Sequence, residues 1–257
     1  MSIWSWPGLK QVRQSAFLNT QLRIGYGQFW GCFDSRSIAE EFLAKSKIVT
    51  YDSDGVVDIN IETFQAVHLF DWPVMFFFQK LHSERKLKVV TDFGGHVGAK
   101  YYAYRNVIPL PSDIKWQVVD VPAICKKGRQ TIKQGDVGLS YHENIYSTES
   151  CDVLLCSGSL QYSDKFVDQV VKELPSYPEI IIINRMSVSN RSFYTLEAFN
   201  KKRMLHRVVT DRYLSEALEG IGYKKLNQWD IPHRNFTVQH QKGKQDVEMI
   251  GQIWVRN

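Results

Sequence analysis

Short apolar runs alternate with amphipathic stretches through the second two-thirds of the chain. Apolar runs of four to eight residues bounded by turn residues predict buried strands, and amphipathic stretches predict helices. Strands that alternate with helices form a parallel sheet with helices on both faces. The sequence therefore predicts a doubly wound, mostly parallel α/β domain over residues 87–257. Its expected strands are 89–93, 116–121, 139–141, 151–156 and 179–184.

The last part of the chain has a different pattern. Residues 223–231 and 247–255 alternate between apolar and polar positions, as half-exposed strands do. The polar stretch 232–246 between them predicts a loop, so the two runs form a terminal antiparallel hairpin. With the five parallel strands, the hairpin gives a seven-stranded sheet. Residues 185–210 are expected to be a long connection that precedes a helix and the hairpin.

The first 86 residues predict a mostly helical appendage, which acts as a lid packed against the α/β domain. Helices are expected from Ser37 to Ser46, from Glu62 to Phe70 and from Asp71 to His82. Residues 1–33 contain three basic residues and three tryptophans but no Asp or Glu. Such a segment favours weak contact with anionic lipid, and its alternative is packing over the ligand site.

Composition excludes several classes of protein. The chain has 257 residues, of which 44% are hydrophobic, and a mean hydropathy of -0.29. No apolar run approaches the ~20 residues that span a bilayer, and the N-terminal residues lack the pattern of a signal peptide. The four cysteines lack CxxC spacing, which predicts thiols in a reducing cytoplasm and no metal site. A net charge of +5 without a recognisable binding module argues against nucleic acid.

One stretch carries the clearest signal for a ligand. The strand 89–93 runs into Gly94, Gly95 and Gly98, and a helix is expected from Ala99. A strand, a glycine turn and a helix together aim backbone N–H groups at a ligand, where a side chain would hold the ligand away. The spacing G-G-x-x-G differs from the G-x-G-x-x-G of dinucleotide sites, with His96 inside it. A tight turn without a ligand is the alternative.

The segment Asp-Phe-Gly-Gly-His-Val-Gly at 92–98 resembles motif I of class I S-adenosylmethionine (SAM) methyltransferases, from which His96 departs. About 20 residues further, Asp120 stands where nucleotide-binding sheets place a carboxylate on the ribose hydroxyls. The segment 156–162 resembles the one that closes over the methionine part of SAM. More closely, the chain resembles a family of proposed methyltransferases encoded beside bacterial surface-polysaccharide genes. The segments that carry this likeness are 92–98, 101–102, 116–122, 160–162 and 183–185.

The resemblance implies a class I, Rossmann-like fold, SAM as the cofactor and a set of site residues. The cofactor-binding residues that it implies are Asp92, Phe93, Gly94, Gly95, Gly98, Asp120, Val121, His142, Glu143, Ser157 and Gly158. The alternative for residues 142–143 is that they are a solvated pair in a loop without a ligand. The alternative for residues 157–158 is that they form an ordinary turn between a strand and a helix. The acceptor is expected to contact Tyr162, Asn184 and Arg185.

Methyl transfer to a hydroxyl needs an aligned oxygen and a base. Histidine suits neutral pH, and His96 and His233 are the residues predicted to be catalytic. Residues 185–207 hold six basic residues against one acid, Glu197. This basic run is either a solvated face or a feature that favours an anionic acceptor.

The sequence thus predicts a cytoplasmic, SAM-dependent O-methyltransferase. Its acceptor would be a sugar hydroxyl of a bacterial surface glycan of the O-antigen or capsule type, or a precursor, anionic or carried on a lipid at the inner face of the membrane. The alternative is a catalytically silent SAM- or nucleotide-binding partner in polysaccharide assembly. A nicotinamide oxidoreductase is disfavoured by the glycine spacing and the terminal hairpin.

Overall fold

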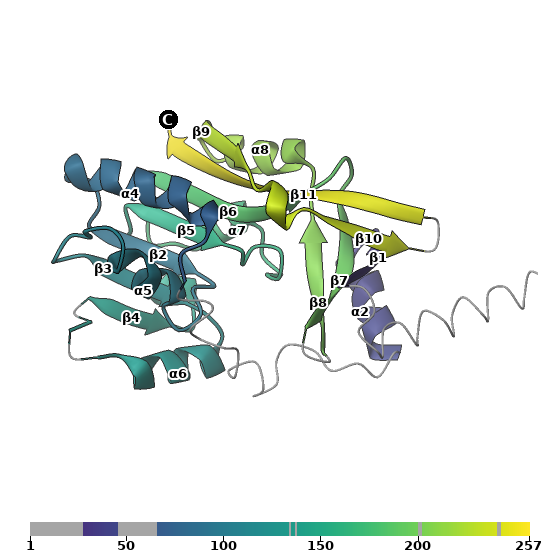
Figure 1. Cartoon of the computed structure of the whole chain (residues 1–257), viewed down its shortest axis with the longest axis horizontal. Coiled ribbons are helices and arrows are strands. Elements are labelled where there is room, and N and C mark those ends of the chain that lie inside the picture. The colour runs from purple at the N-terminus through teal and green to yellow at the C-terminus, as the bar shows by residue number, and fades with distance from the viewer. Residues whose placement is uncertain (1–27, 46–65, 134, 137, 200–201, 241–242) are drawn as a thin grey trace, which may run out of the picture.

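The computed structural model describes residues 28–45, 66–133, 135–136, 138–199, 202–240 and 243–257. Figure 1 shows that strands from distant parts of the chain share one long, strongly twisted sheet. The predicted α/β class is confirmed. The sheet contains eleven paired strands instead of the seven that were expected.

Five parallel strands carry the first half of this sheet, in the order β4-β3-β2-β5-β6. The strand β2 lies between β3 and β5, so the chain reverses its direction of winding there. In such sheets ligands bind outside the carboxyl ends of the strands at the reversal. The five predicted strands are all present with ends shifted by a few residues: β2 (Val89–Phe93), β3 (Lys115–Val119), β4 (Leu139–His142), β5 (Val153–Ser157) and β6 (Ile180–Val188).

Helices cover both faces of the parallel strands because successive side chains of a buried strand point in opposite directions. Ile180 and Ile182 join the core beneath α4 and α5, whereas Ile181 and Ile183 join the core beneath α7 and α8. The helices are α4 (Trp72–Ser83), α5 (Ala99–Arg105), α6 (Pro122–Thr131), α7 (Val167–Lys172) and α8 (Asp211–Glu219), with a 3-10 turn η4 (Ile145–Ser147).

The last long strand, β11 (Gly243–Arg256), lies between β6 and β9 (Tyr223–Asp230) and runs antiparallel to both. The strand β9 is therefore parallel to β6, and its end at Asp230 lies on the carboxyl edge of the sheet. The antiparallel pairing of β9 with β11 agrees with the predicted hairpin. The 3-10 turn η5 (Pro232–Arg234) follows β9 on that edge.

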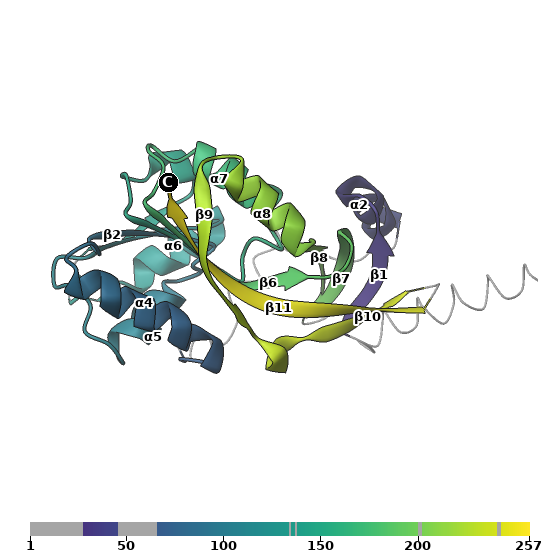
Figure 2. The same ribbon diagram turned by 90° about the horizontal axis from the view of Figure 1, so that it is seen from above.

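The first residues of β11 continue the sheet in a second direction (Figure 2). They pair with β10 (Phe236–His240), which pairs with β1 (Phe29–Phe33). The strand β1 pairs with β7 (Phe193–Phe199), and β7 pairs with β8 (Lys202–Val208). The helix α2 (Arg36–Lys45) packs on this extension through Leu43, which contacts Trp30 and Leu196.

This extension corrects three predictions. The connection 185–210 is the end of β6 and the hairpin β7–β8, and the loop 232–246 contains η5 and β10. The N-terminal part contributes a strand, β1, as well as helices. In β8, basic residues hid the alternation, since Arg203 and Arg207 are buried, whereas a solvated face was one of the two predictions for the basic run 185–207.

The N-terminal helices differ in detail from their predictions. Ser35 rather than Ser37 caps α2, because its Oγ accepts from the amide of Ile38 at 3.3 Å. Of the helix predicted over 62–70, residues 62–65 lie outside the described residues, and the rest forms only the turn η3 (Leu69–Asp71). The helix α4 is present as predicted and packs in the same core as β2. The division at residue 87 stays a prediction.

Candidate functional site

The glycine turn after β2 has the backbone geometry that its sequence predicts. Gly94 and Gly98 have φ angles of 71° and 79°, which glycine adopts without strain. His96 between them has a φ of 55°, and Arg185 on β6 has 62°. Among the described residues only one other non-glycine residue, Arg85, has a positive φ. Backbone strain held by the surrounding structure marks functional sites, and two such residues lie at this edge of the sheet.

The need for glycine has a different cause from the predicted one. A Cβ on Gly94 would collide with Cβ of Ser159, and a Cβ on Gly95 would lie 2.5 Å from Oδ2 of Asp92. A Cβ added to Gly98 would lie 3.1 Å from the hydroxyl oxygen of Tyr141. Packing inside the protein therefore already explains the three glycines. Within the described structure the turn leaves only the amides of Gly95 and Val97 without an acceptor, because the others donate to protein oxygens.

Asp92 lies beneath the glycine turn rather than on its surface. Its side chain is buried, and its Oδ2 accepts a hydrogen bond from Nε1 of Trp116 at 3.1 Å. Burial raises the pKa of this carboxyl to about 7, although the hydrogen bond from Trp116 and the charge of Lys100 oppose the rise. Phe93 beside it packs in the core under α7 and α8. The carboxyl thus supports the turn from below.

Asp120 faces the glycine turn from the end of β3. Its Oδ2 accepts from the amide of His96 and its Oδ1 from the amide of Val121, both at 2.8 Å. Burial raises the pKa of the Asp120 carboxyl, and these two amides lower it in part. A carboxylate has about four acceptor positions, so two amides leave room for two hydroxyls. Val121 next to it exposes 38% of its surface.

His142 and Glu143, at the end of β4, are engaged by neighbouring protein groups. The ring of His142 lies between the hydroxyls of Ser140 and Ser147, at 3.0 and 3.4 Å, and burial lowers its pKa. Glu143 forms an exposed ion pair with Arg129 at 3.0 Å. Their predicted contact with the cofactor stays a prediction, and the described contacts give each residue a structural role.

The end of β5 and the middle of β6 bring Ser157, Gly158, Asn184 and Arg185 together. The Asn184 amide donates to Ser157 Oγ at 3.3 Å, and the Arg185 guanidinium donates to the Ser157 carbonyl at 3.0 Å. A side chain on Gly158 would collide with that guanidinium. Among the described residues, buried Oδ1 of Asn184 and Nε of Arg185 have no hydrogen-bond partner. Unsatisfied buried polar atoms are costly, and each such atom in a folded protein calls for an explanation.

A buried carboxylate that sequence reasoning did not select organises this corner of the site. Asp71, with no exposed surface, accepts from Lys100 Nζ at 2.8 Å, from Tyr104 Oη at 3.0 Å and from Asn184 Nδ2 at 3.3 Å. The amide of His68 donates to it at 3.0 Å. The contact with Asn184 ties the N-terminal turn η3 to the middle of β6. A carboxylate before a Trp-Pro helix start gives no sequence signal for such a role.

Phe70, the neighbour of Asp71, is surrounded by cationic groups. The guanidinium groups of Arg185 and Arg234 lie 4.9 and 5.4 Å from its ring centroid, and the ammonium of Lys100 lies at 5.2 Å. The ring of His233 stacks on it at 6.0 Å, with planes 9° apart. Arg234 and His233 belong to η5, so the turn after β9 reaches this edge as predicted. The result is a cluster of cationic groups around a buried ring, in which Lys100 is paired with Asp71.

His96 and His233 have different surroundings. His96 is buried in the glycine turn, and burial lowers its pKa, which favours the neutral ring. His233 is exposed and rests on Phe70. A neutral histidine is able to accept a proton, but the structure does not bring the two rings into one described contact. Their catalytic role stays a prediction.

Tyr162 joins the site from the segment after β5. Its hydroxyl donates to Glu197 Oε2 at 2.6 Å, and His206 Nδ1 meets the same oxygen at 3.0 Å. Glu197 and His206 were not among the residues predicted to form the site. They occupy β7 and β8, two strands whose pairing no local pattern revealed.

The basic run 185–207 is mostly structural. Arg207 donates to the carbonyl of Asp164 at 2.9 Å and to Tyr194 Oη at 3.1 Å, and Arg203 is buried. Arg191 forms an ion pair with Asp34 at 3.5 Å. Lys201 lies outside the described residues. Arg185 lies against Phe70 at the carboxyl edge, and Arg207 holds the segment after β5 through the carbonyl of Asp164.

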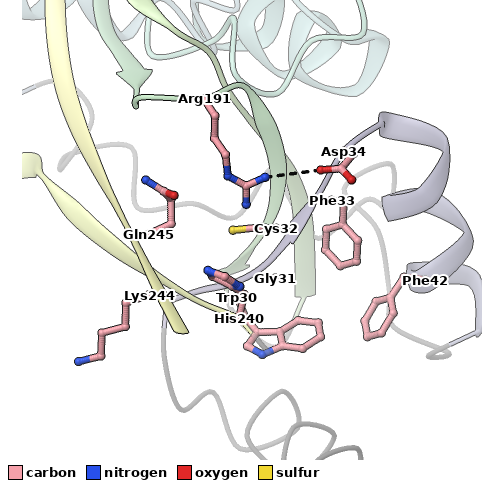
Figure 3. Close-up of a pocket in the computed structure, with 10 residues that line it drawn as sticks. All are labelled: Trp30, Gly31, Cys32, Phe33, Asp34, Phe42, Arg191, His240, Lys244 and Gln245. Atoms are coloured by element: carbon pink, nitrogen blue, oxygen red, sulfur yellow. Dashed lines mark ion pairs between the residues drawn. The ribbon is translucent and has the colours of Figure 1, made fainter. Parts of the chain in front are cut away.

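A separate cavity of about 610 Å³ lies on the extension of the sheet, between β1, α2 and the hairpin of β10 and β11 (Figure 3). Its wall includes Trp30, Cys32, Phe42 and Arg191 but none of the predicted site residues. Three of the four free cysteines are buried, and Cys32 is half-buried. Within the described ranges no cluster of His, Cys, Asp and Glu suits a metal ion, and no helix is long and apolar enough to cross a membrane.

No family model and no curated protein matches the sequence. The 1,6-didemethyltoxoflavin-N1-methyltransferase of Burkholderia thailandensis, solved with S-adenosylhomocysteine (SAH), is 14% identical, with a TM-score of 0.46 over 84% of this chain and 86% of that one. CalS10, an amino pentose methyltransferase from Micromonospora echinaspora solved with SAM, is 8% identical, with a TM-score of 0.46 over 76% and 94%. The N-terminal domain of EvdMO1, solved with SAH and D-fucose, is 12% identical, with a TM-score of 0.47 over 73% and 84%. Each of these three structures contains SAM or its demethylated product.

Proposed function

We propose that the protein is a SAM-dependent O-methyltransferase that acts on a sugar hydroxyl of a bacterial surface glycan or its precursor. The observation that carries the proposal is the position of Asp120. Its carboxylate is fixed by the amide of His96 to the glycine turn, at the strand reversal of the sheet, beside the exposed side chain of Val121. A carboxylate that still has acceptor positions binds a ribose diol, and an apolar neighbour packs on a base.

The other residues at the edge fit the rest of this donor. The amides of Gly95 and Val97, and the unsatisfied atoms of Asn184 and Arg185, offer hydrogen bonds to its amino-acid end. When bound, SAM supplies an electrophilic methyl group. The chain's own residues then have to hold the acceptor oxygen in line, exclude water and receive a proton.

The cationic groups around Phe70 support an anionic acceptor. Arg185 and Arg234 both lie against its ring, and Lys100 is already paired with Asp71. Guanidinium groups suit a phosphate, because each offers several donors in a plane. A nucleotide sugar or a phosphate-linked glycan combines such a phosphate with the hydroxyl to be methylated. A lipid-linked acceptor would bring the enzyme to the inner face of the cytoplasmic membrane.

The donor is tested by calorimetry with SAH. The Asp120→Ala variant should bind SAH more weakly by ~1.5–3 kcal/mol, because hydrogen bonds to a charged group are lost. The matched control is Asp113→Ala, which removes an exposed carboxylate before β3, at the opposite edge of the sheet. Equal affinity of the two variants, or tight NADH binding without SAH binding, would reject the proposal.

The base predicted from the sequence is tested by replacing His96 and His233. If either ring removes the proton, its change to Ala should lower turnover ~10²–10⁴-fold and leave SAH affinity unchanged. Near-normal turnover of the double variant would exclude both rings. A silent binding partner, the alternative function, would bind SAH without transferring methyl groups to any sugar acceptor.

A further inference from the structure

The cavity on the extension of the sheet has an aromatic wall. The rings of Trp30, Phe33 and Phe42 pack on one another, with centroids 5.1 to 6.1 Å apart. Trp30 and Phe33 belong to β1 and Phe42 to α2, and in Figure 3 the three rings lie together toward α2. Leu43 and Leu196 pack against Trp30 and hold this wall in place.

Polar side chains form another part of the lining. Arg191 pairs with Asp34 through Nη1 at 3.5 Å, and a guanidinium carries five N–H groups in one plane. The side chain of Asp34 is 84% exposed, so its oxygens are open to a ligand. The Gln245 amide donates to Ser189 Oγ at 2.8 Å and to Asn190 Oδ1 at 3.1 Å, which fixes its plane. The cavity therefore combines oriented polar groups with the three rings.

Trp30 carries a polar atom that the protein does not satisfy. The residue is 7% exposed, and its buried Nε1 has no hydrogen-bond partner in the described structure. A buried indole N–H usually has a partner, and each exception calls for an explanation. Trp229 Nε1 is a second such atom, but Trp229 does not line the cavity. The two indoles therefore separate an effect in the cavity from a general property of buried tryptophan.

The size and the lining of the cavity suit a sugar ring. Small-molecule sites of about 300–1,000 Å³ combine aromatic side chains with a few placed polar groups, and this cavity measures about 610 Å³. A sugar ring has an apolar face of C–H groups and a rim of hydroxyls. A nucleobase is apolar on both faces and favours rings on both sides. Here the rings form one wall, and Gln245 comes from β11 on another side (Figure 3).

The cavity is distant from the carboxyl edge where methyl transfer is proposed. Asn184 lies opposite the irregular stretch of β11 between Ile250 and Gln252. Gln245 comes five residues before Ile250 in the same strand, which corresponds to about 17 Å at ~3.4 Å per residue. One sugar ring does not span this distance, whereas an oligosaccharide does.

We propose that the cavity binds a sugar unit of the glycan other than the one that is methylated, with its ring on Trp30 and its hydroxyls on Arg191, Asp34 and Gln245. The inference rests on the proposed function, because it assigns a second part of the same acceptor to a second site. Two contacts on one glycan strengthen each other, since the second forms within the complex. The enzyme thus recognises several units of its acceptor and not a single sugar.

NMR of the full chain labelled with ¹⁵N-tryptophan tests the site without any reaction. The probes are the methyl glycosides of glucose, galactose, mannose, N-acetylglucosamine and glucuronic acid, at millimolar concentrations. At least one should move the Trp30 indole signal in a saturable way and leave that of Trp229 in place, with each signal assigned by its loss in the Phe variant. No saturable shift with any probe, or an equal shift at Trp229, would overturn the proposal. A shift at Trp30 with adenosine or SAH alone would make the cavity a nucleoside site and also refute it.

The polar lining is tested with Arg191→Gln. This variant should bind the responding glycoside at least about tenfold more weakly, because hydrogen bonds from a charged donor are lost. The matched control is Arg212→Gln, which breaks an exposed ion pair with Glu216 on α8 and should bind like the wild type. Both changes break ion pairs at the surface, which contribute little to stability. Equal affinities of the two variants would contradict the proposed contacts.

Cys32 gives an independent measurement, because it lines the cavity and is half-buried. The other three cysteines are buried, so N-ethylmaleimide should modify Cys32 first, as followed by mass spectrometry. A glycoside that moves the Trp30 signal should slow this modification in proportion to the occupied fraction. An unchanged rate at saturation would place the sugar outside the cavity and reject the proposal.

Failure of this inference differs from failure of the proposed function. A chain that binds SAH and transfers methyl groups, but whose Trp30 signal no probe moves, overturns only the sugar site in the cavity. A chain that does not bind SAH, but whose Trp30 signal responds to a glycoside, contradicts the proposed function and keeps the cavity as a sugar site.

Discussion

Replacing Asp92 by Asn should make the protein more stable at neutral pH. Asp92 is 1% exposed, and burial, opposed by Trp116 and Lys100 and reinforced by Asp120, raises its pKa from 3.8 to about 7. The folded chain therefore retains a proton that the unfolded chain releases between these two values. The stability associated with this carboxyl is fully present below pH 3.8 and is lost as the pH rises to about 7.

The size of this loss follows from the two pKa values. Their difference is about three pH units, and each unit is worth about 1.4 kcal/mol, so the loss at pH 7 is about 4 kcal/mol. Asn keeps a carbonyl oxygen for the hydrogen bond from Trp116 but has no proton to release. The stability of Asp92→Asn relative to the wild type should thus increase by about 2.5 kcal/mol between pH 5 and pH 8.

Urea unfolding followed by circular dichroism at several pH values measures this difference. Comparing the two proteins at each pH cancels the titration of all other groups and also the fixed cost of burying Asn. Asp113→Asn, at an exposed position, controls for the loss of one negative charge. Parallel curves for Asp92→Asn and the wild type would refute the reasoning, and so would a wild type that gains relative stability as the pH rises.

Two further predictions concern the corner around Asp71 and the N-terminal residues. Lys100→Met should lower the free energy of unfolding by ~3–5 kcal/mol, because it leaves the carboxylate of Asp71 buried without its cation. The control Lys80→Met, which breaks an exposed ion pair with Glu84, should lower it by under ~1 kcal/mol. Similar losses for the two variants in urea unfolding would contradict the ion-pair argument. Deletion of residues 1–14, which lie outside the described residues, should abolish flotation with anionic liposomes at low salt while SAH affinity survives. The three basic residues of 1–33, at ~1 kcal/mol each, give only weak attachment, and the deletion removes two of them, Lys10 and Arg13. Loss of SAH affinity instead, with no flotation of the full chain, would favour a lid.

The sequence by itself determined the parallel half of the sheet. An apolar run such as 153–157 is buried on both faces, and its composition predicts a strand wherever it lies in the chain. The position of Asp120 at the edge followed from the same local logic, because the carboxyl ends of parallel strands share one edge. The glycine turn was also predictable, although packing against Ser159 and Asp92, rather than room for a ligand, explains its glycines.

Only the tertiary structure decided the extension of the sheet and the buried polar pairs. Phe29 in β1 pairs with Glu197, and Trp30 with Gln239, so the strand is stabilised by partners distant in sequence. Asp71 meets Asn184 across 113 positions, and Tyr162 meets Glu197 across 35. From the sequence alone, a charged residue in such a run is expected to be solvated, because charged side chains are rarely buried unless they are paired. The pairing exists only after the strands have assembled, and for that reason the sequence did not show that Glu197 and His206 contact each other.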